Sequence, residues 1–229
     1  MFTVGFREFK SLMTSIRSIV IIAVLFGVTV GAASLVRQFE AQLQELGLGQ
    51  DAYLMGLMLV LILVSPLFVT SLSHNAINKE IDTRTIRFLA TKTSRDQIIL
   101  GKFIGILLFW SVCIAVALLL IIPFSKTFSF LGLIQSIIFV AYFIGWSLLL
   151  STVISKPALT MFLGIVLAIA FPVLGLWSTG TDKFYIEVIG YITPYFYYTQ
   201  EETYYSYFVV IFPILFMLFS LFIFRKRDL

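Results

Sequence analysis

Charged residues are scarce in this chain. Only 12% of its 229 residues are Asp, Glu, Lys or Arg, whereas 60% are hydrophobic. A soluble domain carries roughly 25% charged residues. The net charge of +4 is small and dispersed, which argues against nucleic acid as a partner. The composition therefore predicts a protein whose surroundings are lipid.

Cysteine and histidine each occur once, as Cys113 and His74. A lone cysteine excludes an internal disulfide, and a lone histidine excludes a multi-histidine metal cluster. A hydrolase needs a nucleophile with an oriented base, so we interpret His74 as an interfacial residue. The sequence also lacks a G-x-x-x-x-G-K-[ST] phosphate-binding loop. We therefore expect no catalytic residue, no metal site and no bound cofactor in this chain.

Long apolar runs fill most of the sequence. Crossing a bilayer takes about 20 apolar residues in a helix. Six runs without Asp, Glu, Lys or Arg meet this need, at residues 18–36, 52–73, 103–124, 131–153, 158–177 and 207–224. They predict an all-α integral membrane protein with six transmembrane helices in one transmembrane domain, 1–229. Pro66, Pro172 and Pro213 lie within runs, where we expect kinks, not breaks.

The distribution of positive charge predicts the orientation, because cytoplasmic segments carry an excess of Lys and Arg. With a cytoplasmic N-terminus, three basic residues lie in outer segments: Arg37, Lys126 and Lys183. Thirteen lie in inner segments: Arg7, Lys10, Arg17, Lys79, Arg84, Arg87, Lys92, Arg95, Lys102, Lys156, Arg225, Lys226 and Arg227. We therefore predict a multi-pass protein with both termini in the cytoplasm. The first run is longer than the apolar region of a signal peptide, so we expect it to stay uncleaved.

Two further segments have patterns typical of membrane surfaces. Phe2, Phe6, Phe9 and Met13 recur at helical spacing, which predicts an amphipathic surface helix over residues 2–16. The outer segment 178–206 is rich in tyrosine, a residue that favours the headgroup level. We expect this segment to fold onto the outer leaflet.

The inner loop after the second run has a third helical pattern. Its apolar stripe consists of Ile77, Ile81, Thr85, Phe88 and Leu89. That spacing predicts an amphipathic helix over 76–92, followed by Ser94 as the N-cap of the next helix. Acids and bases interleave around the stripe, whereas a helix that rests on anionic lipid favours a basic polar face. A protein partner and a lipid surface both remain open on this pattern alone.

These loop residues resemble the inner loop of ABC-2 type transporter permeases. The family pattern has an acidic residue, a Gly-Thr pair, leucines, a Pro-x-Ser-Arg stretch and an ending of Ile, then Gly or Ala, then Lys. The matching positions are Asp82, Thr85, Phe88, Leu89, Ser94, Arg95, Ile98, Gly101 and Lys102. Arg84 stands where the glycine is usual, and no proline precedes Ser94. The order of surface helix, six runs, inner loop and basic tail also resembles this family.

The resemblance implies a subunit of a bacterial ABC exporter in the cytoplasmic membrane. Helix 76–92 would be a coupling helix that docks on a separate ABC ATP-binding subunit, where ATP and Mg²⁺ bind. Its docking residues would be Ile81, Asp82, Arg84, Thr85, Arg87, Phe88 and Leu89, with Ser94 and Arg95 as the cap into the third helix. The resemblance also implies an outer re-entrant hairpin over 178–206, for which a plain aromatic belt is the alternative, and a second permease chain, identical or different.

A stripe of small residues runs along the first apolar run, at Ala23, Gly27 and Gly31. Gly164 and Ala168 repeat the pattern in the fifth run. Such faces let helices approach closely. Ordinary packing within one bundle and a seam with a second permease chain are both compatible with it, and the first is the simpler interpretation.

The uncharged runs favour ATP-driven export of an amphipathic peptide, drug or lipid. Ion-coupled carriers usually place ionisable residues within their spans, and these six runs have none. Two alternatives remain open: a membrane anchor or sensor without transport activity, and an ion-coupled secondary carrier.

Overall fold

The structure, a computed structural model, describes residues 1–45, 51–83, 85, 93–181, 183–200 and 202–226. In this part of the chain the regular elements are all helices. The long ones are α2 (Ile16–Gln38), α4 (Asp51–Ser73), α7 (Arg95–Ser125), α8 (Phe130–Val153), α9 (Pro157–Ser178) and α13 (Ile211–Lys226). Six helical segments are long and apolar enough to cross a membrane. The predicted all-α fold with six transmembrane helices is confirmed.

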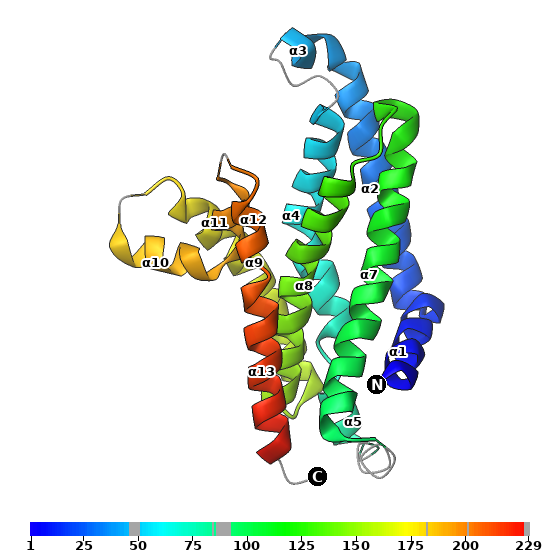
Figure 1. Cartoon of the computed structure of the whole chain (residues 1–229), viewed down its shortest axis with the longest axis vertical. Coiled ribbons are helices and arrows are strands. Elements are labelled where there is room, and N and C mark those ends of the chain that lie inside the picture. Colours follow the sequence, from blue (N-terminus) through cyan, green and yellow to red (C-terminus); the bar gives the residue numbers. More distant parts are fainter. Residues whose placement is uncertain (46–50, 84, 86–92, 182, 201, 227–229) are drawn as a thin grey trace.

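Short helices connect the long ones. They are α1 (Phe2–Thr14), α3 (Glu40–Glu45), α5 (Asn78–Asp82), α10 (Phe184–Ile192), α11 (Pro194–Tyr198) and α12 (Tyr205–Phe208). The N-terminus, α5 and the last turn of α13 lie at one end of the bundle, and α3 lies at the other (Figure 1). We call the end with α1 and α5 the loop end.

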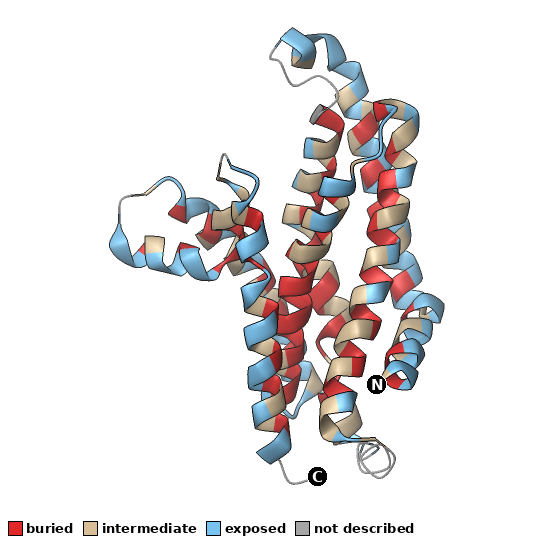
Figure 2. Cartoon of the chain, in the orientation of Figure 1, coloured by how far each residue is buried: buried red, intermediate tan, exposed pale blue. Residues whose placement is uncertain are grey.

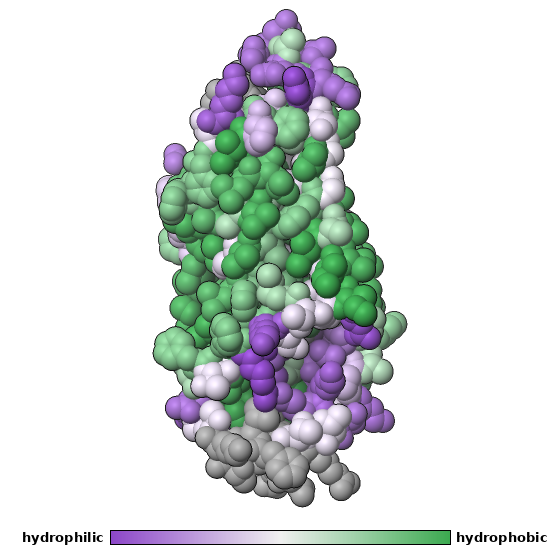
Figure 3. All heavy atoms as spheres, turned by 90° about the vertical axis from the view of Figure 1, so that its right-hand side faces the viewer, coloured by the Kyte–Doolittle hydropathy of each residue, from purple (hydrophilic) through white to green (hydrophobic). Residues whose placement is uncertain are grey.

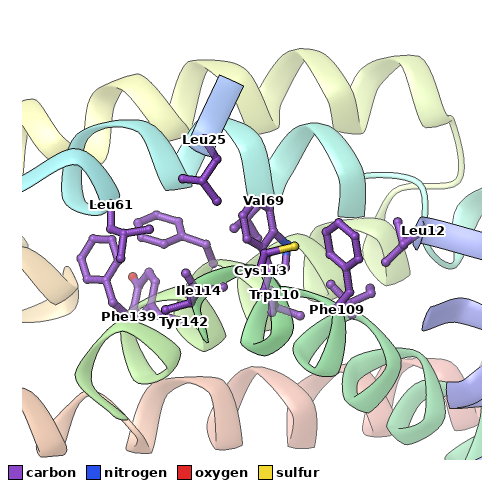
Figure 4. Close-up of a cluster of buried hydrophobic side chains, with 14 of the residues drawn as sticks. Leu12, Leu25, Leu61, Val69, Phe109, Trp110, Cys113, Ile114, Phe139 and Tyr142 are labelled. Atoms are coloured by element: carbon purple, nitrogen blue, oxygen red, sulfur yellow. The ribbon is translucent and has the colours of Figure 1, made fainter. Parts of the chain in front are cut away.

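The centre of the bundle is made by α4, α7 and α8. In α8, 56% of the most apolar stretch is buried, against 17% in α2, which therefore lies at the periphery. Buried residues face inward along the central helices, whereas exposed ones cover the outer faces (Figure 2). Figure 4 shows Leu25 of α2, Val69 of α4 and Trp110 of α7 within this core. The exposed side chains of the outer helices are mainly large and apolar, as a lipid environment requires.

Single residues explain where two of the long helices begin. Ser94 is the N-cap of α7, as its position in the sequence predicts, so the helix begins at Arg95 and continues into the apolar run that starts at 103. A turn at 209–210 joins α12 to α13, and Tyr205–Lys226 together form the sixth span, which contains the expected run 207–224. Pro213 has no N–H to give to the carbonyl of Val209, which instead accepts from the backbone N–H of Phe212 at 3.1 Å. The helix continues past Pro213, as α4 and α9 continue past Pro66 and Pro172.

The loop helix is shorter than expected in its described part. The sequence predicts one helix over 76–92, but α5 ends at Asp82 and Thr83 is its C-cap. Residue 84 and residues 86–92 lie outside the described residues. The surface helix α1 likewise ends at Thr14, because Ser15 has an extended backbone that turns the chain into α2.

Candidate functional site

Three glycines let α1 cross α7 in backbone contact at the loop end. A Cβ atom on Gly101 would lie 2.9 Å from both the carbonyl oxygen of Met1 and the Cβ of Val4. A Cβ on Gly5 would lie 2.9 Å from the carbonyl oxygen of Gly101, and one on Gly105 would lie 2.9 Å from the Cβ of Glu8. Any larger residue would push the helices apart. The crossing places Glu8 beside the first turns of α7.

A cluster of charged side chains joins α1, α5 and α7 at this crossing. The Nζ of Lys102 lies 3.2 Å from Oε2 of Glu8 and 3.0 Å from Oε1 of Glu80. Arg7 adds a third ion pair, with Nη2 at 3.2 Å from the same Glu80 oxygen. The Lys102 side chain is only 3% exposed. A buried ammonium is tolerated only when it is paired, so the two carboxylates hold three separate elements to one point.

The opposite side of α5 is bound to α8 and α9 by neutral hydrogen bonds. The backbone N–H groups of Ile77 and Asn78 donate to Oγ of Ser151, at 2.9 and 3.1 Å. The side-chain amide of Asn78 donates to Oγ1 of Thr160 at 2.6 Å. All four residues are fully buried. We call Glu8, Asn78, Glu80 and Lys102 the loop junction, because together they fix the start of the inner loop to four helices.

The far end of the inner loop is fixed to α13. Ser94 caps α7 by accepting a hydrogen bond from the backbone N–H of Gln97 at 3.4 Å. Arg95 donates to the carbonyl oxygens of Phe224 and Arg225, at 3.3 and 2.7 Å. Arg225 in turn forms a two-pronged ion pair with the Asp96 carboxylate, through Nε at 2.8 Å and through Nη2. Both ends of the loop are thus anchored in the bundle.

A family model described as ABC-2 family transporter protein matches residues 3–229. The chain belongs to the ABC-2 transporter family. It is a multi-pass membrane protein and the permease of an ABC-type transporter, which works with an ABC ATP-binding subunit. A comparison with curated proteins found no match.

The structure places the expected docking residues of this ABC-2 permease in different surroundings. Ile81 is half-buried and packs against the core of its own chain, and Ile77 before it is fully buried. Asp82 and Thr85 are exposed. The remaining expected docking residues lie outside the described residues: Arg84, Arg87, Phe88 and Leu89. The first part of the apolar stripe therefore serves packing within the permease, and the docking role of the rest stays a prediction.

Sequence reasoning missed the loop junction of the permease. Neither Glu8 nor Glu80 was among the expected functional residues. In the structure Glu80 contacts Lys102 and Arg7. One local signal was available: Lys102 follows Ile98, Ile99 and Leu100 at the start of an apolar helix, where an unpaired lysine would be costly. Its partners could not be read from the same segment.

The two small-residue stripes have different surroundings. A Cβ on Gly164 of α9 would contact Thr70 of α4, so this stripe packs within the bundle. Gly27 and Gly31 of α2 have no atom within 4 Å of the Cβ position, and Ala23 is exposed. Among the described residues no other helix packs on the α2 stripe. The described residues therefore give the α2 stripe no packing partner within the bundle, and its role stays a prediction.

The outer segment of the permease folds as two helices against α9. α10 and α11 lie across the long axis of the bundle and project from its side (Figure 1). A Cβ on Gly175 of α9 would lie 2.6 Å from the Cβ of Tyr195, so the contact is close. Tyr142 and Tyr195 donate to the carbonyl oxygens of Ile192 and Ile62, at 2.8 and 3.1 Å. Tyr191 donates to the Glu187 carboxylate at 2.6 Å, which raises the pKa of that phenol. The re-entrant position of this hairpin in the bilayer stays a prediction.

Proposed function

We propose that this permease forms the membrane pathway of a bacterial ABC exporter that moves an amphipathic peptide, drug or lipid outward. A separate ATP-binding subunit docks on the inner loop, at residues 76–92, and supplies the energy. That subunit binds ATP and Mg²⁺, and the permease itself catalyses no reaction. The protein resides in the plasma membrane with both termini in the cytoplasm, the orientation that the distribution of basic residues favours.

The loop junction is the observation that carries this proposal. A displacement of the inner loop moves α5 first. Glu80 of α5 contacts Lys102, so α7 moves with it, and Lys102 also contacts Glu8, so α1 follows. From Asn78 the displacement passes to α8 and α9. A rigid element whose displacement moves several spans together is what ATP-driven alternating access requires.

The α2 stripe supports a second permease chain. Ala23, Gly27 and Gly31 form an open small-residue face on the helix that is least buried in this chain. Such a face accepts another helix at close range. A second copy, or a related chain, would pack there and complete the pathway.

Paired charge at the loop end favours ATP coupling over ion coupling. A carrier for ions needs ionisable groups along its pathway that bind and release the ion. In the described residues the buried ammonium of Lys102 contacts the carboxylates of Glu8 and Glu80. Lys102 is the eighth of the 31 residues of α7, so this cluster lies near the inner loop and not midway along the helix.

The decisive experiment distinguishes loss of binding to the ATP-binding subunit from loss of the motion that the inner loop passes to the helices. The permease and its ATP-binding subunit are reconstituted, and binding, ATP hydrolysis and substrate export are measured. Phe88→Asp should lose binding of the ATP-binding subunit and uncouple ATP hydrolysis from export. Glu80→Gln should keep the binding but lower export several-fold, because it weakens the contact that passes motion to α7.

The matched control is Phe39→Asp, the same change in a residue that is 55% exposed at the opposite end of the bundle. It should keep binding and export. Full export by Phe88→Asp would refute the docking role. Export driven by an ion gradient, without any ATP-binding subunit, would identify a secondary carrier. A chain that binds a cytoplasmic partner and exports nothing would be an anchor or sensor.

A further inference from the structure

A polar cavity of about 880 Å³ opens at the loop end, between α1, the end of α4, α5 and the start of α7. Four basic and two acidic side chains line it: Arg7, Arg17, Lys79, Lys102, Glu8 and Glu80. Figure 3 faces this side of the molecule and shows hydrophilic residues gathered near its lower end, beneath a broad apolar surface. The cavity therefore combines a surplus of positive charge with a position at the edge of the apolar part of the bundle.

The basic residues of the cavity fall into two groups. Lys102 and Arg7 contact carboxylates of the loop junction. Arg17 and Lys79 are exposed, and within the described part of the chain neither has an ion-pair partner. The surplus of positive charge thus lies on these two side chains. A ligand that complements the cavity must bring negative charge to them.

The surroundings of Arg17 indicate a ligand that also has an apolar part. Arg17 lies in the first turn of α2, next to Ile16, which is 80% exposed, and three residues before Val20, which is 57% exposed. Phe2 and Phe6 of the neighbouring α1 are 80% and 68% exposed. These side chains suit contact with acyl chains. Basic pockets between transmembrane helices are where anionic lipid headgroups bind.

We propose that this cavity binds the phosphate of an anionic phospholipid, with Arg17 and Lys79 as the residues that contact it. The hydroxyl groups of Ser15, Ser71 and Thr85 also line the cavity and can donate to phosphate oxygens. The lipid would lie against α1 and α5 and thus fill the space beside the loop junction. Binding needs no ATP-binding subunit, so its test does not depend on the proposed export function.

Binding is measured on the purified, delipidated full chain by native mass spectrometry with phosphatidylglycerol. Phosphatidylcholine with the same acyl chains and inorganic phosphate are the comparison ligands. The variant Arg17→Ala/Lys79→Ala should bind phosphatidylglycerol roughly thirtyfold more weakly, the factor for two basic residues at a membrane surface. Both side chains are exposed, so the variant should keep its helical content, as circular dichroism would check.

The matched control is Lys10→Ala/Lys226→Ala, which removes two exposed basic residues at the same end of the molecule but outside the cavity. It should bind phosphatidylglycerol like the unaltered chain. Equal weakening by both pairs would show only general surface attraction and overturn the site. Equal affinity for phosphatidylcholine would overturn the anionic preference. Displacement of the lipid by millimolar inorganic phosphate would show that free phosphate, not a lipid, is the ligand.

Discussion

The loop end and the outer hairpin of this permease satisfy their buried polar groups by different means. At the loop end, Lys102 is held by carboxylates from two other elements, at 3.0 and 3.2 Å. At the outer hairpin, tyrosines bury their rings and donate to backbone carbonyls. Tyr198, for example, donates to Gln135 at 2.5 Å. Ion pairs add to neutral hydrogen bonds at the loop end, whereas ring packing adds to them at the hairpin.

The difference suggests different mechanical roles. The aromatic rings interlock: Tyr198 packs on Phe139 and Tyr142 on Phe143, each pair with centroids 5.1 Å apart. Such contacts are lost when the rings shift slightly. An ion pair loses its energy more gradually with distance and can tolerate a small displacement. We infer that the helices shift relative to one another at the loop end during transport, whereas the contacts of the outer hairpin stay fixed.

Removal of Lys102 should have the largest effect on stability. Lys102→Met leaves the mostly buried Glu8 without a cation and Glu80 with Arg7 alone, and breaking a buried ion pair in this way costs about 3–5 kcal/mol. The free energy of unfolding, measured by denaturant titration in mixed micelles, should fall by that amount.

The triple variant Glu8→Gln/Glu80→Gln/Lys102→Met is the control. It removes the two buried carboxylate charges together with the cation, so it should recover most of the lost stability. A triple variant as unstable as Lys102→Met would show that packing around the lysine stem, and not its charge, holds the loop end.

A smaller loss should follow from separating α1 and α7. Gly105→Ala places a methyl group against the backbone of Gly5 and 2.9 Å from the Cβ of Glu8. Overpacking of this kind costs about 1–3 kcal/mol. The same titration measures it. Gly180→Ala, also in open space and outside the α2 stripe, is the matched control and should lose no stability. Equal losses in both variants would mean that glycine itself, and not the helix crossing, is required.

The spans of this permease could be predicted because each is a property of one continuous stretch of sequence. An apolar run long enough to cross the bilayer is visible without knowing its neighbours. Ser94 could likewise be predicted as the N-cap of α7, because a cap lies directly beside the helix that it begins. The turn between α12 and α13 was not expected, because hydropathy alone does not show it.

The loop junction could not be predicted because its members are far apart in the sequence. Lys102 and Glu8 are separated by 94 positions, and Asn78 and Thr160 by 82. Spacing within a helix reveals only neighbours three or four residues away. It does not show that the helix crossing at Gly101 and Gly105 brings Glu8 beside Lys102. Glycines that fit a helix crossing were the clue to this contact.

Removal of one tyrosine hydroxyl at the outer hairpin should have the smallest effect. Tyr198→Phe keeps the ring against Phe139 but removes the hydroxyl that donates to Gln135. A neutral hydrogen bond of this kind contributes about 1 kcal/mol, so the free energy of unfolding should fall by about that much. Tyr198→Ala also removes the ring and should cost about 3–5 kcal/mol. If Tyr198→Phe lowered the free energy of unfolding as much as Tyr198→Ala, the hydroxyl and not the ring would hold the outer hairpin. The hairpin and the loop end would then both depend on polar contacts.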